Sequence, residues 1–287
     1  MIKLASCQYA IPLITSWDNY AHHLAELIDD AATQGADLLL LPEYAGLALA
    51  GQLDDAARTD LVGSISGIQS LIPNWLALCE KLAQKHKIIL QPGTVPVRDP
   101  DGQYRNRAWL FGPEGMIGHQ DKQIMTRFER EQWGIAAGVE GLRTFQTAIG
   151  KLGILVCYDN EFPMLGRKLC ELGAVLVLAP SCTDTPAGSY RVRIGAQARA
   201  LENQYAVLSS PTAGKVAWSP ALDENHGRAA LYVPSDYGMP ASGIFAESPS
   251  NTVEKTSWLI VDIDLADVTR LRTEGQVTTH RDWPEQF

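Results

Sequence analysis

The sequence lacks the cysteine, histidine and glycine patterns that mark several classes of protein. Its five cysteines include no Cys-x-x-Cys pair, and its six histidines show no spacing typical of metal ligands. We therefore expect no catalytic metal, and the odd number of widely spaced cysteines favours a reducing, cytoplasmic location. No glycine-rich phosphate loop follows an apolar run, so nucleotide chemistry has little support.

Long apolar runs and clustered positive charges are also missing. No run approaches the roughly 20 apolar residues that cross a bilayer, and residues 1–10 interrupt their apolar side chains with polar ones, unlike a signal peptide. The formal net charge of -9, without a long Lys/Arg run, opposes binding to nucleic acid or to acidic membranes. We expect a soluble protein whose partner is a small molecule.

The composition is that of a globular protein, with 46% hydrophobic and 20% charged residues. Apolar runs that predict strands alternate with amphipathic segments that predict helices. The predicted strands are residues 2–8, 37–41, 87–90, 104–111, 116–120, 143–147, 152–157, 174–179, 206–210 and 257–264. The predicted helices include residues 18–34, 162–172 and 190–203. These strands are too many for one short sheet, so we predict an α/β fold with two packed sheets and outer helices, a four-layer αββα sandwich.

No linker-like or low-complexity segment divides the chain. We therefore expect residues 1–287 to form a single domain, with residues 265–287 as a C-terminal tail. The only large irregular region, residues 216–250, is rich in Gly, Pro, Ser and Asp, which predicts long surface loops around a strand at residues 229–233. These loops are candidates for a pocket wall.

Three polar residues, Glu43, Lys122 and Cys157, each follow an apolar strand at its carboxyl end, where layered α/β folds commonly bind ligands. Partial desolvation there would raise the pKa of Glu43 and make it a useful general base. Lys122 could hold a developing oxyanion in a dry pocket. Cys157 lies between a strand and a predicted helix, so backbone amides and the helix dipole could favour its thiolate.

Each of these residues also has a purely structural interpretation. Glu43 could be a solvated loop glutamate, Lys122 could pair with Asp121 at the surface, and Cys157 could be a buried structural cysteine. Cys182 also ends a buried strand and is a candidate for lining the same pocket. The other cysteines fit a structural role: Cys7, Cys79 and Cys170.

Taken in order, three motifs resemble the Glu, Lys and Cys signatures of the nitrilase superfamily: Leu-Leu-Leu-Pro-Glu ending at Glu43, Asp121-Lys122, and Val-Cys-Tyr-Asp around Cys157 with a following Phe-Pro. Residues 199–203, Arg-Ala-Leu-Glu-Asn, are similar to the helix that follows the cysteine region in that family. The resemblance spans roughly residues 1–264. It implies an αββα sandwich, a homodimer or larger assembly, no cofactor, and hydrolysis of nitriles, amides or N-carbamoyl compounds through a thioester.

The resemblance also implies roles for the three residues. Cys157 would attack the substrate carbon while Glu43 takes its proton, passes it to the leaving amine and later activates water. Lys122 and the backbone amide of Tyr158 would hold the oxyanion.

Many members of the superfamily carry a second pocket glutamate after the lysine, and both Glu129 and Glu131 are candidates. We predict Glu131, because Trp-Gly follows it. A salt bridge from Glu131 to Arg127 or Arg130 is the structural alternative.

The predicted substrate is a neutral or singly charged small amide, with Tyr158, Cys182 and Arg127 at its binding site. Arg191 or Arg193 could supply a further clamp for a substrate carboxylate. Glu161 stands where many relatives have arginine before the Phe-Pro, so substrate preferences inferred from those relatives are in doubt.

Other functions remain open at this stage. The chain could be a nitrilase or an N-carbamoyl hydrolase, or a non-catalytic member that binds a small molecule, because a fold does not guarantee activity. A cysteine hydrolase that uses a histidine is a further alternative, but none of the six histidines has a recognisable catalytic context.

Overall fold

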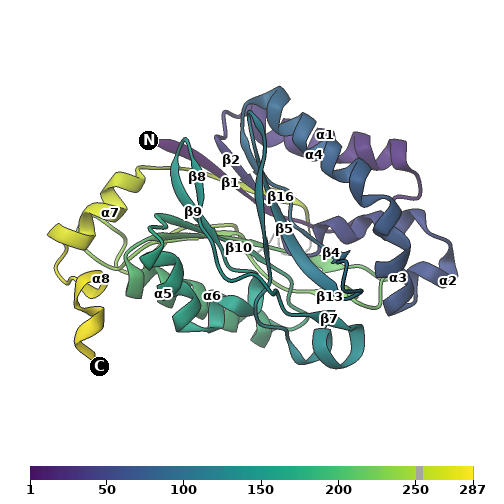
Figure 1. Ribbon diagram of the computed structural model, residues 1–287. Helices are drawn as coiled ribbons and strands as arrows, with labels where there is room; N and C mark the ends of the chain where they lie inside the picture. The colour runs from purple at the N-terminus through teal and green to yellow at the C-terminus, as the bar shows by residue number, and fades with distance from the viewer. Residues whose placement is uncertain (250–254, 287) are drawn as a thin grey trace.

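A computed structural model, which describes residues 1–249 and 255–286, shows two sheets packed face to face with helices on their outer faces (Figure 1). The first sheet has the order β16-β1-β2-β3-β5-β4, and β6 and β7 also pair with β5. Its strands are β1 (Ile2–Gln8), β2 (Leu38–Leu40), β3 (Ile89–Gln91), β4 (Thr94–Arg98), β5 (Tyr104–Gly112), β6 (Gly115–Asp121), β7 (Ile135–Ala136) and β16 (Ser257–Ile263).

The second sheet has the order β15-β14-β11-β10-β9-β8. Its strands are β8 (Phe145–Thr147), β9 (Gly150–Ile154), β10 (Leu176–Ser181), β11 (Ala206–Pro211), β14 (Ala230–Tyr232) and β15 (Ile244–Glu247). A small separate ribbon pairs β12 (Gly214–Lys215) with β13 (Glu224–Asn225). The predicted strand at residues 229–233 is therefore β14, and residue 250 of the predicted loop region lies outside the described residues.

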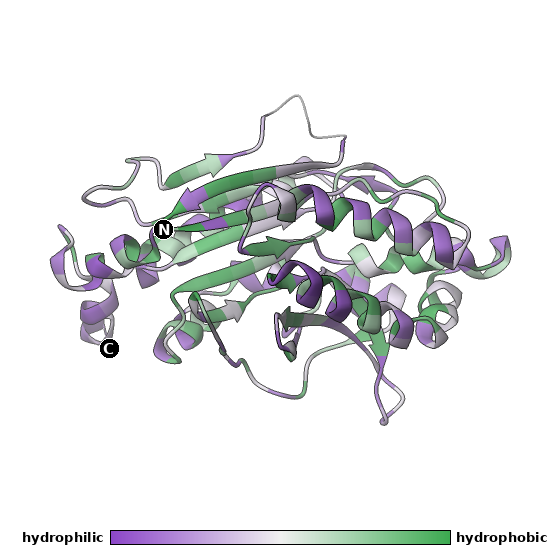
Figure 2. Cartoon of the chain, turned by 90° about the horizontal axis from the view of Figure 1, so that it is seen from above, coloured by the Kyte–Doolittle hydropathy of each residue, from purple (hydrophilic) through white to green (hydrophobic). Residues whose placement is uncertain are grey.

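Helices α1 (Trp17–Thr33) and α4 (Ile72–His86) cover the first sheet, and α5 (Pro163–Glu171) and α6 (Pro186–Asn203) cover the second (Figure 1). Figure 2 shows apolar strands in the middle and polar residues on the outward helix faces. The shorter helical segments are η1 (Ala45–Gln52), α2 (Asp55–Arg58), α3 (Leu61–Gly67), η2 (Ile68–Ser70), η3 (Glu129–Trp133), η4 (Cys157–Glu161), α7 (Leu265–Glu274), α8 (Thr279–Asp282) and η6 (Trp283–Gln286).

Alternation along the buried strands produces the layers. In β2, Leu38 and Leu40 pack between the two sheets, whereas Leu39 packs toward the helices on the first sheet. In β10, Leu176 and Leu178 likewise enter the space between the sheets, and Val177 joins the cluster beneath the outer helices. Successive side chains of a strand point to opposite faces, so strands that are apolar throughout are buried on both. The predicted αββα sandwich is confirmed.

Helix α6 begins earlier than the predicted residue 190. The Thr185 side chain accepts a hydrogen bond from Gly188 N at 3.1 Å, and Pro186 occupies the first turn, where its missing N–H is no loss. The sequence signal for this start is Thr-Pro, which apolar periodicity alone does not detect.

The segment predicted as a C-terminal tail forms α7, α8 and η6 over its described residues. Leu265 and Val268 join the cluster between the sheets, and Arg272 donates to the backbone O of Ala174 at 2.8 Å. The segment is thus attached to the sandwich, and the single domain over residues 1–287 stays a prediction.

Within the described residues, no single helix has the length and apolar composition of a membrane span. The bent pair Leu61–Ser70 and Ile72–His86 meets those criteria together, across an angle of 63°.

Candidate active site

Cys157 follows the carboxyl end of β9, where the backbone turns sharply. Its φ is 50°, in the left-handed region that non-glycine residues occupy at a cost of about 1–3 kcal/mol. The thiol is buried, and Sγ donates to the backbone O of Cys182 at 3.4 Å. Cys157 begins the 3-10 turn η4, and α5 begins only at Pro163, beyond that turn.

The prediction of a favoured thiolate at Cys157 is wrong. Burial raises the pKa of the thiol well above its ordinary value, and the neighbouring Glu43 carboxylate raises it further, while Lys122 opposes the shift only in part. Helix α5 begins only after η4, so its dipole lies too far from the thiol to offset these effects on the pKa. The side chain of Cys157 is therefore held as the neutral thiol, which would need a base in order to react as a nucleophile.

Glu43 is fully enclosed at the end of β2. Its Oε1 accepts hydrogen bonds from Lys122 Nζ and Asn106 Nδ2, each at 2.8 Å, and its Oε2 accepts one from Cys182 N at 2.9 Å. Burial raises its pKa to about 7, against the opposing charge of Lys122. The predicted desolvation is confirmed, and a carboxylate with this pKa suits general base catalysis near neutral pH.

Lys122 follows β6 and is equally buried. Its Nζ donates to Glu43 Oε1 at 2.8 Å and to both oxygens of Glu129, at 2.8 and 2.7 Å. Burial alone would lower the pKa of the ammonium, but Glu129 and Glu43 together hold that pKa well above its ordinary value. The site thus contains a fixed positive charge, and the surface-lysine interpretation is wrong.

The second buried glutamate is Glu129, and the prediction of Glu131 is wrong. The Glu129 side chain is 3% exposed and also accepts hydrogen bonds from Tyr44 Oη at 2.5 Å and from Thr126 N at 2.8 Å. Glu131 is 52% exposed and pairs with Arg127 at 2.8 Å. This ion pair is the structural alternative that the sequence left open for Glu131. Burial would raise the pKa of Glu129, but Lys122 brings it below the ordinary value.

A sequence signal for Glu129 exists. Thr126 Oγ1 accepts a hydrogen bond from Glu129 N at 3.3 Å while Glu129 Oε2 accepts one from Thr126 N, which is the reciprocal pattern of a capping box. The spacing Thr-x-x-Glu therefore favours Glu129 over Glu131. Asn106, in contrast, lies within β5 with no local motif, and only the fold brings it to Glu43.

A cavity of about 390 Å³ opens above the thiol. Tyr158, Cys182 and Arg127 line it together with Cys157, as predicted for substrate-binding residues, and their roles stay predictions. Glu161 and Arg191 also line the cavity and pair with each other at 3.4 Å. Among the residues lining the cavity there is no histidine, so the geometry offers no support for a Cys-His hydrolase.

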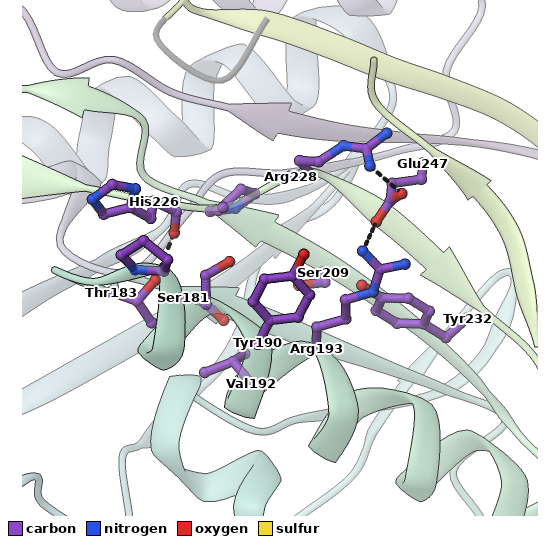
Figure 3. Close-up of a pocket in the computed structure, with 14 residues that line it drawn as sticks. Ser181, Thr183, Tyr190, Val192, Arg193, Ser209, His226, Arg228, Tyr232 and Glu247 are labelled. Carbon is purple, nitrogen blue, oxygen red and sulfur yellow. Dashed lines mark hydrogen bonds and ion pairs between the residues drawn. The ribbon is translucent and has the colours of Figure 1, made fainter. Parts of the chain in front are cut away.

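Figure 3 shows a second cavity, of about 260 Å³. It lies beside the first, since Thr183 and Val192 line both. Arg193 and Arg228 lie in its wall and share one carboxylate, Glu247, at 2.9 and 2.5 Å. Two guanidinium groups on one carboxylate leave a net positive charge, because arginine stays protonated.

Metal binding has no obvious site in the described part of the chain, where no group of three or more His, Cys, Asp or Glu side chains could hold an ion.

Residues 3–273 match the sequence model of one family, described as carbon-nitrogen hydrolase. The chain belongs to the carbon-nitrogen hydrolase family. This membership confirms the resemblance to the nitrilase superfamily inferred from the three motifs.

Two relatives align with very different shares of the chain. The Bacillus subtilis protein named "Probable hydrolase YhcX" is 31% identical over 281 residues, which are 98% of this chain and 53% of the relative. The chain thus spans about half the length of that relative. The Saccharomyces cerevisiae protein named "Omega-amidase NIT3" is 32% identical over 141 residues, 45% of this chain and 48% of the relative.

Solved structures of the nitrilase superfamily share the fold. The crystal structure of Saccharomyces cerevisiae Nit3 has a TM-score of 0.75 at 23% identity, covering 98% of this chain and 96% of that chain. An amidase from Nesterenkonia sp. AN1, with acrylamide added to its active-site cysteine, has a TM-score of 0.68 at 23% identity, covering 99% and 100%.

Proposed function

We propose that the chain hydrolyses the carbon-nitrogen bond of a small amide through a thioester on Cys157. The observation that carries this proposal is the buried cluster of Cys157, Glu43 and Lys122, in which Glu43 and Lys122 pair directly, both act electrostatically on the thiol, and Cys157 lines the larger cavity. A thiol, a base with a pKa near neutrality and a fixed cation are the parts that acyl transfer to sulfur requires. The yeast relative named omega-amidase supports an amide as the substrate.

In the first half of the reaction, Glu43 accepts the Cys157 proton as the sulfur attacks the carbonyl carbon. The carbonyl oxygen becomes an oxyanion, which the Lys122 ammonium and the backbone N–H of Tyr158 stabilise. Glu43 then gives its proton to the departing nitrogen, the C–N bond breaks, and ammonia or an amine leaves a thioester.

In the second half, Glu43 accepts a proton from water as the water oxygen attacks the thioester. The same donors stabilise the second oxyanion, the C–S bond breaks, and the proton returns to the sulfur. Glu129 keeps Lys122 charged throughout, because it accepts from Nζ with both oxygens.

The charges around the two cavities support a neutral or singly anionic amide. Arg127 and Arg191 are each paired with one carboxylate, Glu131 and Glu161, so they add little net charge. Arg193 with Arg228 retains one positive charge, which suits one carboxylate at the end of a substrate that extends past Val192.

A nitrile is the second candidate substrate. The Pyrococcus abyssi protein named "Nitrilase" is 28% identical over 75% of this chain, and the same thiol, base and cation suit attack on a nitrile carbon.

We also propose a homodimer or larger homo-oligomer in the cytoplasm. Apolar side chains on α5 and α6 are well exposed, including Met164, Tyr190 and Ile194 at 60, 60 and 62%. Exposed apolar side chains on neighbouring helices are typical of an interface, and a second copy of the chain is the proposed partner. All five cysteines are free, which supports a reducing compartment.

The test is a screen of aliphatic amides, N-carbamoyl amino acids and nitriles with ammonia release as the readout. Cys157→Ala is the blank, and Cys79→Ala, at a buried cysteine that lines neither cavity, is the matched cysteine control. Release from at least one amide by the wild type, absent in the blank, is expected. Equal release by wild type and blank would reject the proposed function.

A further inference from the structure

Lys122 and Cys157 belong to different sheets of the sandwich. Lys122 follows β6 in the first sheet, and Cys157 follows β9 in the second. Apart from a backbone bridge between Tyr9 and Thr212, the facing sheets form no shared ladder in the described residues. Their relative position therefore depends on side-chain packing and on a few specific links. That position matters here, because misplacing a reacting group by about 1 Å can cost roughly 100-fold in rate.

Asp159 provides such a link. Its buried carboxylate accepts a hydrogen bond from Val156 N, the residue before the nucleophile, at 3.2 Å. It also accepts from Gln123 N at 3.2 Å and from Ile124 N at 2.8 Å, in the segment that follows Lys122. Hydrogen bonds to an ionised acceptor are roughly twice as strong as those between neutral groups.

The other members of the cluster are fixed differently. Glu43 is tied directly to the second sheet through Cys182 N. Lys122 is not, because its Nζ donates only to Glu43 and Glu129 and its backbone N only to Asn106 O. Among the described residues, all direct hydrogen bonds between residues 121–126 and the turn η4 (Cys157–Glu161) are accepted by Asp159.

We propose that Asp159 is a positioning residue that sets the place of Lys122 relative to the Cys157 thiol. This inference rests on the proposed function, since it concerns the oxyanion formed during amide hydrolysis. Burial raises the pKa of Asp159 to about 6, so its carboxylate is largely ionised, as the three N–H donors require, above that pH. Asp159 acts mainly on the stabilisation of the oxyanion, because Glu43, which takes the proton of Cys157, keeps its own hydrogen bond to Cys182 N in the second sheet.

Two reactions of the same thiol separate these effects. Amide hydrolysis needs the oxyanion and therefore Lys122. Alkylation by iodoacetamide forms an S–C bond and expels iodide while Glu43 takes the thiol proton, and no oxyanion forms. Asp159→Asn keeps the size of the side chain and removes its charge and one acceptor oxygen. We expect kcat for amide hydrolysis to fall about 10-fold or more, with the alkylation rate within about threefold of wild type.

Asp236→Asn is the matched control. Asp236 also bridges two backbone segments, by accepting from Tyr237 N and Gln276 N at 2.7 Å each, and it lines neither cavity. That control should keep both rates. Hydrogen exchange adds a readout that needs no substrate: the amides of Gln123 and Ile124 should exchange faster in Asp159→Asn than in wild type.

Equal losses in both reactions, an unchanged kcat, or unchanged exchange at Gln123 and Ile124 would overturn the proposal. If Asp159→Asn does not fold, Asp159→Glu is measured in the same way, with the same split expected because the longer side chain displaces the Lys122 segment. A wild type that hydrolyses no amide would reject the proposed function, while the exchange measurement would still decide whether Asp159 holds the two segments together.

Discussion

Lys122 Nζ donates to both oxygens of Glu129, at 2.8 and 2.7 Å, and to only one oxygen of Glu43. The two carboxylates therefore differ in their protonation. Lys122 brings the pKa of Glu129 below its ordinary value despite burial, whereas burial raises the pKa of Glu43 to about 7. One carboxylate is a permanent counterion, and the other is free to exchange a proton.

Glu129→Gln should lower the pKa of Glu43, because the negative charge of Glu129 helps to raise it. The acid limb of the profile of kcat/KM against pH, expected at about pH 7 for wild type, should move to lower pH. Turnover should fall about 10-fold or more, since the lysine loses its bidentate partner. Glu131→Gln, in the exposed pair with Arg127, is the control and should keep the wild-type profile. A shifted limb in Glu131→Gln alone would contradict the assignment.

Alkylation of Cys157 by iodoacetamide should become faster as pH rises through about 7. The thiol has a raised pKa, so it reacts through the base, and Glu43 can accept its proton only when ionised. Mass spectrometry of tryptic peptides would follow Cys157 and Cys182 separately. Glu43 should titrate between pH 6 and 8, because its pKa is about 7. An alkylation rate that is independent of pH in this range would show that Glu43 is not the base.

Glu43→Gln should abolish most turnover with little loss of thermal stability. A carboxyl whose folded pKa is raised, here to about 7, contributes its full stabilisation below its unfolded pKa, and that contribution declines as pH rises from the unfolded pKa through the folded pKa. Wild type should therefore lose stability from about pH 4.5 to 7 through this group, and the variant should lack that loss. Thermal melts at several pH values provide the measurement. Loss of the cooperative unfolding transition in the thermal melt of Glu43→Gln at pH 8 would mean that Glu43 is needed for folding rather than for chemistry.

Arg193→Gln and Arg228→Gln should each raise KM for an amide that bears a remote carboxylate. One bidentate charge-assisted contact is lost, so we expect an increase of about 10-fold or more. The KM of the uncharged amide with the same chain length is the control and should stay within about twofold. Steady-state kinetics with amide substrates of increasing acyl-chain length would locate the substrate carboxylate. Equal increases in KM for the charged and the uncharged amide would place that carboxylate outside the second cavity.

Ile194→Glu should shift the protein toward the monomer. The Ile194 side chain is exposed on α6, as are Tyr190 on the same helix and Met164 on α5. A charge that is buried without a partner in an interface disfavours association. Light scattering at micromolar concentration would compare it with wild type. A monomeric wild type would contradict the proposed assembly.

The sequence predicted much of the fold because its strands are short, apolar and regularly spaced. Residues 37–41 and 174–179 have no polar face, and this pattern requires cover on both sides, as the two packed sheets provide. The positions of Glu43, Lys122 and Cys157 after the ends of strands could also be predicted, from the apolar run that precedes each residue. The start of α6 was not, since it depends on a cap at Thr185 rather than on periodicity.

The protonation of the site could not be predicted in the same way. Burial raises the pKa of the Cys157 thiol, and Glu43, which lies far away in sequence, raises it further. The pKa of Glu43 depends in turn on its own burial and on the charges of Lys122 and Glu129. Such contacts exist only after folding. The choice between Glu129 and Glu131 was within reach of the sequence, through the capping-box spacing from Thr126.

The four consecutive leucines that include β2 have a consequence for the choice of register. A slip of one residue would put leucine in place of leucine at most buried positions, so hydrophobicity alone hardly distinguishes the two alignments. The same slip would move Glu43 by about 3.3 Å along the strand. It would break the hydrogen bonds that Glu43 makes with Lys122, Asn106 and Cys182. The polar residues that prepare the chemistry therefore also help to select the native alignment of the strand.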